Sequence, residues 1–223
     1  MHSRVSWWTD ESIRWFERAS KASTYHRCLT SEIEKHINKN ESVIEFGCGL
    51  GYEAQLLSDD GYEIKALDKD SRVIDKAKKR TGKDIFFCAD ASAIVDKADI
   101  VLCINYGHIE DVDDLKAILS HAKKKLVYVI SRHSGHNQET RPDRTELICR
   151  ILDAAGMVYS KSDFSLDFNQ PLTSMEEASK FIRWTYLERN EEEYMKYVRR
   201  SEDSRYPFCF MNRKNMVLFS IKV

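Results

Sequence analysis

Short apolar runs alternate with helical patterns along the middle of this chain, and this order limits the folds that the chain can adopt. The clearest run is Ile-Val-Leu-Cys-Ile at 100–104, which is apolar throughout and does not alternate with polar residues. Continuous apolar strands of this kind suit a parallel sheet covered on both faces. Strands are expected at 42–46, 63–67, 84–88, 99–104 and 125–130, and helices at 52–59, 70–80, 112–121 and 142–155. Strict alternation predicts a doubly wound α/β sheet with right-handed crossovers.

The flanking segments add two strands and several helices. Two helical patterns precede the first strand, with Asp10 and Thr24 as candidate N-caps. Gly156 is expected to end a helix, and further strands are expected at 157–164 and 216–223. Two more helices are expected within 174–202, where Ser174 and Glu177 fit a capping box.

We therefore predict one domain over 1–223, built on a seven-stranded, mostly parallel sheet. It is expected to contain an N-terminal helical cap at 1–40, a ligand-binding core at 42–163, a helical insertion or substrate lid at 164–215 and a last strand at 216–223.

Composition argues against several classes of protein. Lys+Arg 35 against Asp+Glu 36 leaves a net charge of −1, so no overall positive field would recruit nucleic acid. Basic clusters at 76–80 and 123–125 fall at or beside expected helix ends, where the helix dipole and solvent account for them. The first twelve residues lack the apolar core of a signal peptide, and no apolar run approaches the ~18 residues that a membrane span needs. A cytoplasmic protein is expected, without a membrane partner.

The cysteine pattern gives no sign of a metal site. Six cysteines are scattered without C-x-x-C pairing. Without an export signal they read as reduced thiols, most of them small core residues. We predict no bound metal.

A glycine-rich turn follows the first expected strand. The sequence there is Val-Ile-Glu-Phe-Gly-Cys-Gly-Leu-Gly-Tyr over 43–52, with glycine at every second position from Gly47 to Gly51. Such glycines serve a loop whose backbone must approach a ligand. A dinucleotide-binding loop, G-x-G-x-x-G, would need glycine at 52, where Tyr52 stands.

Carboxylates follow the next two strands. Asp68 ends the second strand, 17 residues after Gly51, and this spacing places it beside the glycine turn, where it can accept hydrogen bonds from ribose hydroxyls. Asp70 is the better cap for the following helix, which leaves Asp68 for a ligand. Asp90, followed by the small Ala91, ends the third strand.

Together these features resemble the class I S-adenosylmethionine (SAM) methyltransferases. The turn matches the E-x-G-x-G-x-G form of motif I, Asp68 and Asp90 follow in order, and Asn-Tyr-Gly-His at 105–108 corresponds to motif IV. The resemblance covers roughly 42–131 and implies a Rossmann-like fold with SAM as cofactor. It implies that Glu45 lies near the methionyl amino group, Asp68 at the ribose and Asp90 at the adenine. The cofactor residues implied are Glu45, Gly47, Cys48, Gly49, Gly51, Asp68, Lys69, Asp90, Ala91, Asn105 and Tyr106.

The methyl acceptor is less constrained. Residues 105–108 depart from the N-P-P-[YF] tetrapeptide of amino-methylating DNA, RNA and protein-glutamine enzymes, which argues against a nucleic-acid base. Histidines cluster after the fourth and fifth strands, and a base with a pKa near neutral would suit an oxygen, nitrogen or thiol acceptor. His133 is our first candidate base and His108 the second. Tyr25 is expected to line the site, and Arg132 is a candidate for binding a substrate carboxylate or phosphate.

The leading hypothesis is methyl transfer to an O, N or S atom of a small molecule, by a monomer or homodimer. Alternatives are a protein or RNA methyltransferase, and a non-catalytic protein that binds SAM or S-adenosylhomocysteine (SAH). A NAD-dependent oxidoreductase is disfavoured by Tyr52.

Overall fold

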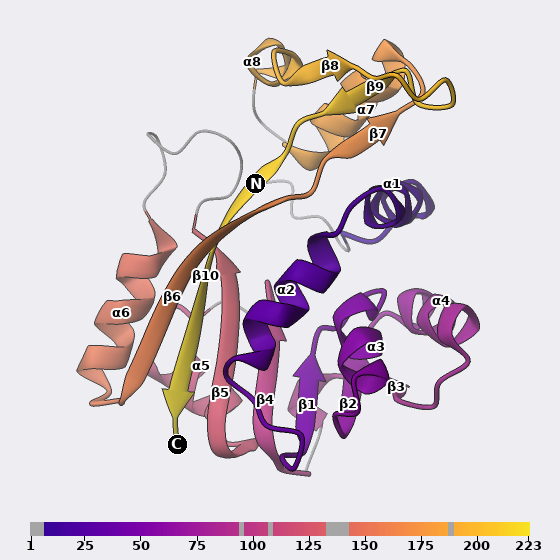
Figure 1. Ribbon diagram of the computed structural model, residues 1–223. Coiled ribbons are helices and arrows are strands. Elements are labelled where there is room, and N and C mark those ends of the chain that lie inside the picture. Colours follow the sequence, from indigo (N-terminus) through magenta and orange to yellow (C-terminus); the bar gives the residue numbers. More distant parts are fainter. Residues whose placement is uncertain (1–6, 94–95, 107–108, 133–142, 187–189) are drawn as a thin grey trace. The chain divides into compact units, whose positions relative to one another are not determined.

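The structure of the protein, a computed structural model, describes residues 7–93, 96–106, 109–132, 143–186 and 190–223 (Figure 1). The described residues divide into two compact units. Of the described residues, the sheet unit contains 26–93, 96–106, 109–132, 143–164 and 215–223, and the accessory unit contains 7–25, 165–186 and 190–214.

The predicted seven-stranded sheet is confirmed, and it is mostly parallel. Its order is β3-β2-β1-β4-β5-β10-β6. Strands β1 to β5 pair in parallel, whereas β10 is antiparallel to β5. The strand order reverses between β1 and β4, and ligands of open α/β sheets bind at this kind of position. The strands are β1 (Val43–Phe46), β2 (Ile64–Asp68), β3 (Phe86–Cys88), β4 (Ala98–Ile104), β5 (Ala122–Ser131), β6 (Tyr159–Asp167) and β10 (Arg213–Lys222).

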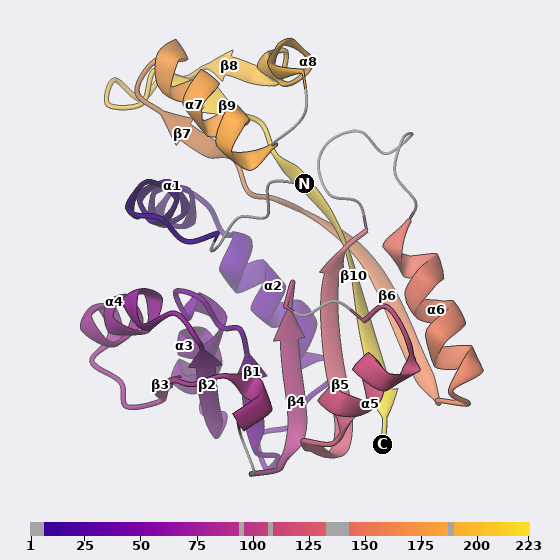
Figure 2. The same cartoon turned by 180° about the vertical axis from the view of Figure 1, so that it is seen from behind.

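Helices cover both faces of this sheet. Figure 1 shows α2 crossing one face, and Figure 2 shows α5 on the other. The helices here are α2 (Tyr25–Glu34), α3 (Tyr52–Asp59), α4 (Ser71–Thr81), α5 (Val112–Leu119) and α6 (Arg144–Ala154), with a 3₁₀ turn at Ala91–Ala93.

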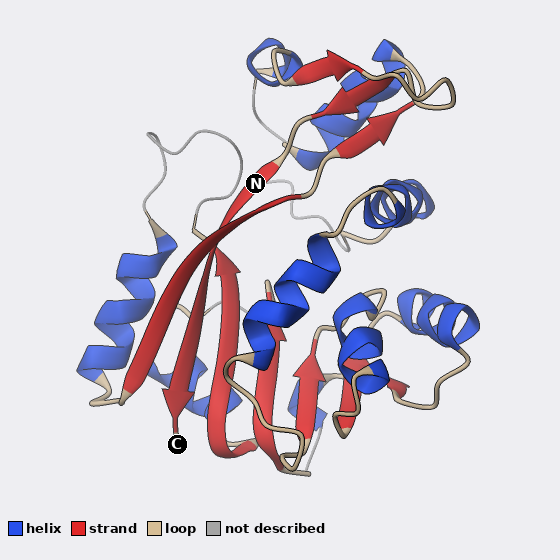
Figure 3. Cartoon of the chain, in the orientation of Figure 1, coloured by secondary structure: helices blue, strands red, loops and turns tan. Residues whose placement is uncertain are grey.

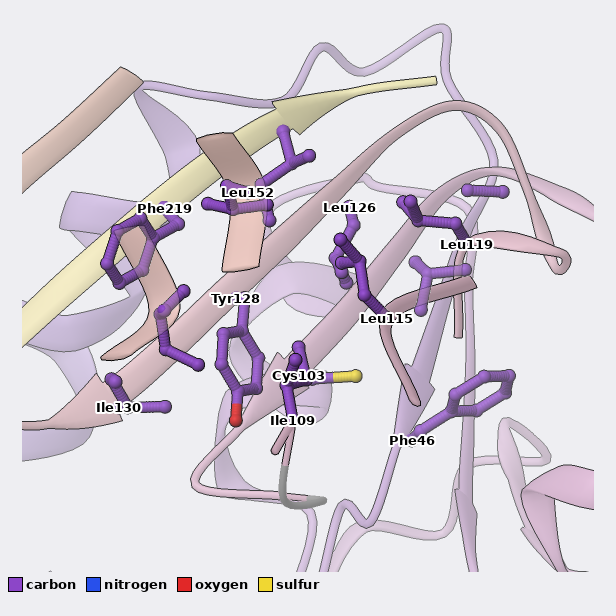
Figure 4. Packing of buried hydrophobic residues seen from close by; sticks show 14 of the residues in the cluster. Phe46, Cys103, Ile109, Leu115, Leu119, Leu126, Tyr128, Ile130, Leu152 and Phe219 are labelled. Carbon is purple, nitrogen blue, oxygen red and sulfur yellow. The ribbon is translucent and has the colours of Figure 1, made fainter. Parts of the chain in front are cut away.

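Because helices cover both faces of the sheet, its central strands consist of continuous apolar residues. Leu126 and Tyr128 pack in one core cluster with Leu115 and Leu152 from the helices on that face (Figure 4). Val127 points to the opposite face because side chains alternate along a strand, yet it is fully buried as well. A strand buried on both faces needs apolar residues at every position, as the sequence has.

The accessory unit is built from α1 and the segment between β6 and β10. Three short strands form an antiparallel sheet in the order β7-β9-β8 (Figure 3). Its core includes Trp15, Leu172, Phe181 and Phe210. The elements are α1 (Asp10–Lys21), β7 (Gln170–Leu172), α7 (Met175–Thr185), α8 (Glu191–Met195), β8 (Val198–Arg200) and β9 (Phe208–Phe210).

The prediction of a purely helical insertion at 164–215 is therefore incomplete. Its two helices are present, but the three strands have only three residues each. One contains Pro171 and another contains Arg199 and Arg200. The third, Phe-Cys-Phe at 208–210, is apolar but too short for a sequence pattern to reveal.

Helix ends follow the predicted capping chemistry with two corrections. Asp70 caps α4 and Gly156 is left-handed after α6, as predicted. The first helix is capped by Thr9, whose hydroxyl accepts from the Ser12 amide, and not by Asp10. Ser174 accepts from the Glu177 amide, but the Glu177 carboxylate accepts from Thr173 and does not complete the box.

Candidate functional site

The glycine turn between β1 and α3 has a backbone that only glycine adopts easily. Gly47, Gly49 and Gly51 have φ angles of 70°, 52° and 68°, in the left-handed region that L side chains disfavour. A Cβ on Gly47 would overlap the ring of Tyr106, and one on Gly51 would overlap the ring of Phe86. The glycines thus allow both the conformation of the turn and its close contact with two aromatic rings.

Asp68 lies beside this turn, as its spacing predicts. One carboxylate oxygen accepts from the Gly49 amide at 2.9 Å and the other from the Asp70 amide at 2.9 Å. The Cys48 amide donates to the Leu67 carbonyl at 2.9 Å. The turn is therefore tied to the carboxyl end of β2, and each Asp68 oxygen keeps a lone pair for a further donor.

Glu45 is a buried carboxylate on β1. It is 2 % exposed, and its Oε2 has no hydrogen-bond partner among the described residues. Burial, together with the nearby Glu53 and Asp68, raises its pKa well above the ordinary value. A buried carboxylate in this state calls for a cationic donor. The ammonium group of an amino acid meets that requirement, so the residues fit the methionyl end of SAM.

Cys48 is buried in the same turn and is not a reactive thiol. Burial raises its pKa, and the carboxylates of Glu45 and Asp68 add to the effect. Its Sγ lies 3.8 Å from the Gly49 carbonyl. Its side chain packs within the turn, which leaves only its backbone for a ligand.

The ends of β3 and β4 lie close to the turn. The Ala89 amide donates to the Asp68 carbonyl at 3.0 Å, which fixes the start of the Asp90–Ala91 segment beside β2. Cys88 Sγ lies 3.7 Å from the carbonyl of Lys69, whose own side chain is exposed.

After β4 the chain turns sharply at Asn105. Its φ of 50° makes it the one described non-glycine residue with a positive φ. Its amide donates to the Val129 carbonyl at 2.8 Å, and its Oδ1 accepts from the Ser131 amide at 3.0 Å. The turn directs Tyr106 over Gly47, where burial and the neighbouring Cys103, Asp90 and Asp68 raise the pKa of its hydroxyl. Asparagine tolerates this conformation better than most residues, but the sequence alone did not reveal the constraint.

Of the three candidate catalytic residues, Tyr25 alone lies within the described part of the chain. His133 and His108 lie outside the described residues, so their role as bases stays a prediction. Tyr25 lies in the accessory unit, 7 % exposed, with its ring 4.5 Å from that of Phe168. A role in the site for Tyr25 also stays a prediction.

Arg132 is already paired, which weakens its candidacy as an anion-binding residue. Its guanidinium donates to Asp143 at 2.6 Å and to Asp163 at 3.1 Å. Burial opposes ionisation of Asp143, but the hydrogen bonds from Thr145 and Arg132 lower its pKa to about 2. Two carboxylates thus already neutralise the guanidinium that would have to bind a substrate anion.

Across the described ranges, no group of three or more His, Cys, Asp or Glu residues could hold a metal ion. No helix in those ranges is long and apolar enough to cross a membrane.

Comparison with known proteins assigns this arrangement to a family. A family model described as a methyltransferase domain matches residues 15–202. Over 84 residues the chain is 33 % identical to a malonyl-[acyl-carrier protein] O-methyltransferase of Hamiltonella defensa, covering 37 % of this chain and 32 % of that protein. Over 138 residues it is 27 % identical to an uncharacterized protein of Haemophilus influenzae, covering 58 % and 51 %. The chain thus spans about a third and about half of the lengths of these relatives.

A solved structure shows the same fold. Magnesium protoporphyrin IX methyltransferase from Synechocystis PCC 6803, with bound SAH, aligns with a TM-score of 0.56. The alignment covers 97 % of this chain and 89 % of that one at 11 % identity, so the likeness is one of fold.

Proposed function

The chain belongs to the family of methyltransferase domains and has the class I, Rossmann-like fold, and from this premise we propose that it transfers a methyl group from SAM to an O, N or S atom of a small molecule. The assignment of SAM as the cofactor rests mainly on the buried carboxylate of Glu45. Its buried, unpartnered Oε2 beside a left-handed glycine turn suits the ammonium of SAM better than any part of NAD.

Each part of the cofactor would be held by a different group of residues in or beside the glycine turn. Glu45 would hold the methionyl ammonium, and the backbone of Gly47 to Gly51 would lie along the cofactor. Asp68 would accept from the ribose hydroxyls with its remaining lone pairs. Asp90 and the Ala91 amide would meet the adenine. When bound, SAM would supply a methyl group on a sulfonium centre, and neutral SAH would be the leaving group.

The protein's own part in transfer is mainly alignment and exclusion of water. Tyr106 and Asn105 lie at the end of β4 beside the glycine turn, where an acceptor would approach. An aromatic ring there can add cation–π attraction for a sulfonium, on the order of 1 kcal/mol. A base is needed only when the acceptor must lose a proton, and His133, His108 and Tyr25 remain our candidates for it.

A small-molecule acceptor is favoured over nucleic acid. The net charge of −1 supplies no general attraction for a polyanion. The malonyl-[acyl-carrier protein] enzyme matches over too short a stretch to favour its own carrier-bound substrate.

Two measurements test the proposal. Calorimetry with SAM, SAH and NAD in parallel is expected to show binding of the first two and none of NAD; the reverse preference would refute the cofactor assignment. Methyl-labelled SAM is then incubated with the protein and separate small-molecule, RNA and protein fractions. Label in the small-molecule fraction is the expected result. Label in RNA or protein would move the acceptor to that class, and SAM binding with no transfer to any fraction would favour a non-catalytic binding protein.

A further inference from the structure

Three side chains from three helices form a stack next to the glycine turn. The ring of Tyr52, the first residue of α3, lies parallel to the ring of His26 from α2, with 4.4 Å between centroids and 11° between planes. The guanidinium of Arg80 from α4 lies 4.0 Å from the centroid of the same Tyr52 ring. Two groups centred this close to one ring would overlap on a single face, so they lie on opposite faces.

Each outer member of the stack has a second contact. His26 Nδ1 lies 2.6 Å from Glu53 Oε1, and both residues are buried. Arg80 donates to the Leu50 carbonyl at 2.7 Å and also to the side-chain oxygen of Gln55. Arg80 therefore connects α4 directly to the backbone of the glycine turn.

The hydrogen bond from Arg80 reaches the Leu50 carbonyl, which lies between two glycines of the turn. Gly49 and Gly51, on either side of Leu50, both have left-handed backbones. Glycine has access to many conformations, so a turn containing three of them loses its shape easily when free. A charged, planar donor stacked on a fixed aromatic ring is well suited to hold one carbonyl in place.

We propose that Arg80 and Tyr52 are positioning residues that hold the glycine turn in its SAM-binding conformation, with His26 and Glu53 fixing the far side of the stack. The basic cluster at the end of α4 is thus not only a solvated helix end. Arg80 is half-buried and turned to the loop, whereas Lys78 and Lys79 are exposed. The proposal rests on SAM as cofactor and is independent of the acceptor.

Arg80→Ala is the main test, with Lys79→Ala as the matched control. Both remove one positive charge from the last turn of the same helix, but only the first removes the contact with Leu50. The affinity for SAH is measured by calorimetry without any acceptor. We expect at least a tenfold loss for Arg80→Ala and less than a twofold change for Lys79→Ala.

Two further variants separate positioning from simple helix packing. Tyr52→Phe keeps the ring and is expected to bind SAH as the unchanged protein does, whereas Tyr52→Leu removes the platform and is expected to lose affinity like Arg80→Ala. Hydrogen exchange of the 47–51 amides is expected to speed up in Arg80→Ala and to slow again when SAH is added in excess. If Arg80→Ala does not fold, Arg80→Lys is compared instead, because it keeps the charge but loses the planar stack; the same tenfold loss is expected.

The result that overturns the proposal is a folded Arg80→Ala protein, or Arg80→Lys in its place, that binds SAH within twofold of the unchanged protein, even if it melts at a lower temperature. An equal loss of affinity in Tyr52→Phe and Tyr52→Leu would overturn the role of the ring. Failure of the unchanged protein to bind SAH would instead overturn the cofactor assignment, so the two failures can be told apart.

Discussion

At the scale of single residues, Gly47 and Gly82 form a natural comparison. Both have left-handed backbones, with φ of 70° and 66°, but a Cβ on Gly47 would overlap Tyr106, whereas no described atom lies within 4 Å of one on Gly82. Alanine at either position carries a backbone cost of roughly 1–2 kcal/mol. Only Gly47→Ala must also displace a ring, at a further cost of roughly 1–3 kcal/mol.

We therefore predict that Gly82→Ala lowers the free energy of unfolding by the backbone cost alone and leaves SAH affinity unchanged. Gly47→Ala should lose more stability and bind SAH at least tenfold more weakly. Urea denaturation and calorimetry measure the two effects. If Gly47→Ala binds SAH as tightly as Gly82→Ala does, the contact between Gly47 and Tyr106 has no role in binding.

The buried Glu45 leads us to predict that both the stability of the protein and its affinity for SAH depend on pH. Its pKa in the fold is raised above its ordinary value of 4.5 because it is buried near Glu53 and Asp68. The folded state therefore holds this proton more tightly than the unfolded state. The stabilising effect is complete below pH 4.5 and is lost as pH rises from 4.5 through the raised pKa. The ammonium of SAH, in contrast, needs the ionised carboxylate.

Glu45→Gln should thus raise the stability of the free protein at pH 8 and weaken SAH binding there by roughly 30-fold, the loss of about 2 kcal/mol expected for a charged hydrogen bond. In the unchanged protein, SAH affinity should fall as pH is lowered, and in Glu45→Gln it should not. The exposed Glu63→Gln is the control. If Glu45→Gln is less stable than the unchanged protein at pH 8, the buried carboxylate of Glu45 does not destabilise the free protein as we infer.

At the scale of elements, Glu177 joins α1 to α7 within the accessory unit. Its carboxylate accepts from Trp15 Nε1 at 3.0 Å, from Arg18 Nη1 at 2.8 Å and from the Thr173 amide at 2.6 Å. Burial opposes ionisation, but these donors outweigh it and lower the pKa of Glu177 to about 2. The resulting stabilisation is present above the ordinary value of 4.5 and is lost as pH falls from there toward 2.

Glu177→Gln is therefore expected to lower the free energy of unfolding by about 2 kcal/mol at pH 7, and the difference from the unchanged protein should shrink below pH 4.5. Urea denaturation followed by tryptophan fluorescence measures it. Glu176→Gln, which removes an exposed partner of Lys180 on the same helix turn, should change stability by less than about 0.5 kcal/mol. A constant difference between pH 7 and pH 3 would contradict the ionic origin of the effect.

The sequence predicted the elements whose signals are local. Strands β1 and β4 and residues 126–130 of β5 were predicted because both of their faces are buried. Strands β2 and β3 have exposed residues and were predicted from shorter apolar runs in the alternating order. Asp68 was placed because one helix and one strand separate it from Gly51. The sheet of the accessory unit was missed because its strands are only three residues long, and two of them carry Pro171 or arginines. Arg80 was missed for another reason: it meets Leu50 only because α4 packs against the turn, and no local pattern encodes a contact 30 residues apart.

At the scale of the whole molecule, the two units carry different probes. All four tryptophans, at positions 7, 8, 15 and 184, belong to the accessory unit. The residues from Glu45 to Tyr106 that we propose to bind the cofactor belong to the sheet unit. Two strands, β6 and β10, are each continuous across the boundary between the units. Tryptophan fluorescence therefore reports on one unit, whereas the SAH site that we propose lies in the other.

Because β6 and β10 are neighbours in the sheet and both continue into the accessory unit, we expect the two units to unfold together. SAH at 100 times its Kd should add about 2.7 kcal/mol of stability. In a protein of this size that gain raises the melting temperature by roughly 5–10 °C. The shift should be the same by circular dichroism, which follows both units, and by tryptophan fluorescence, which follows the accessory unit alone. A fluorescence transition that comes first and ignores SAH would mean that the accessory unit folds independently, and that the continuous strands do not transmit the stability gained at the cofactor site.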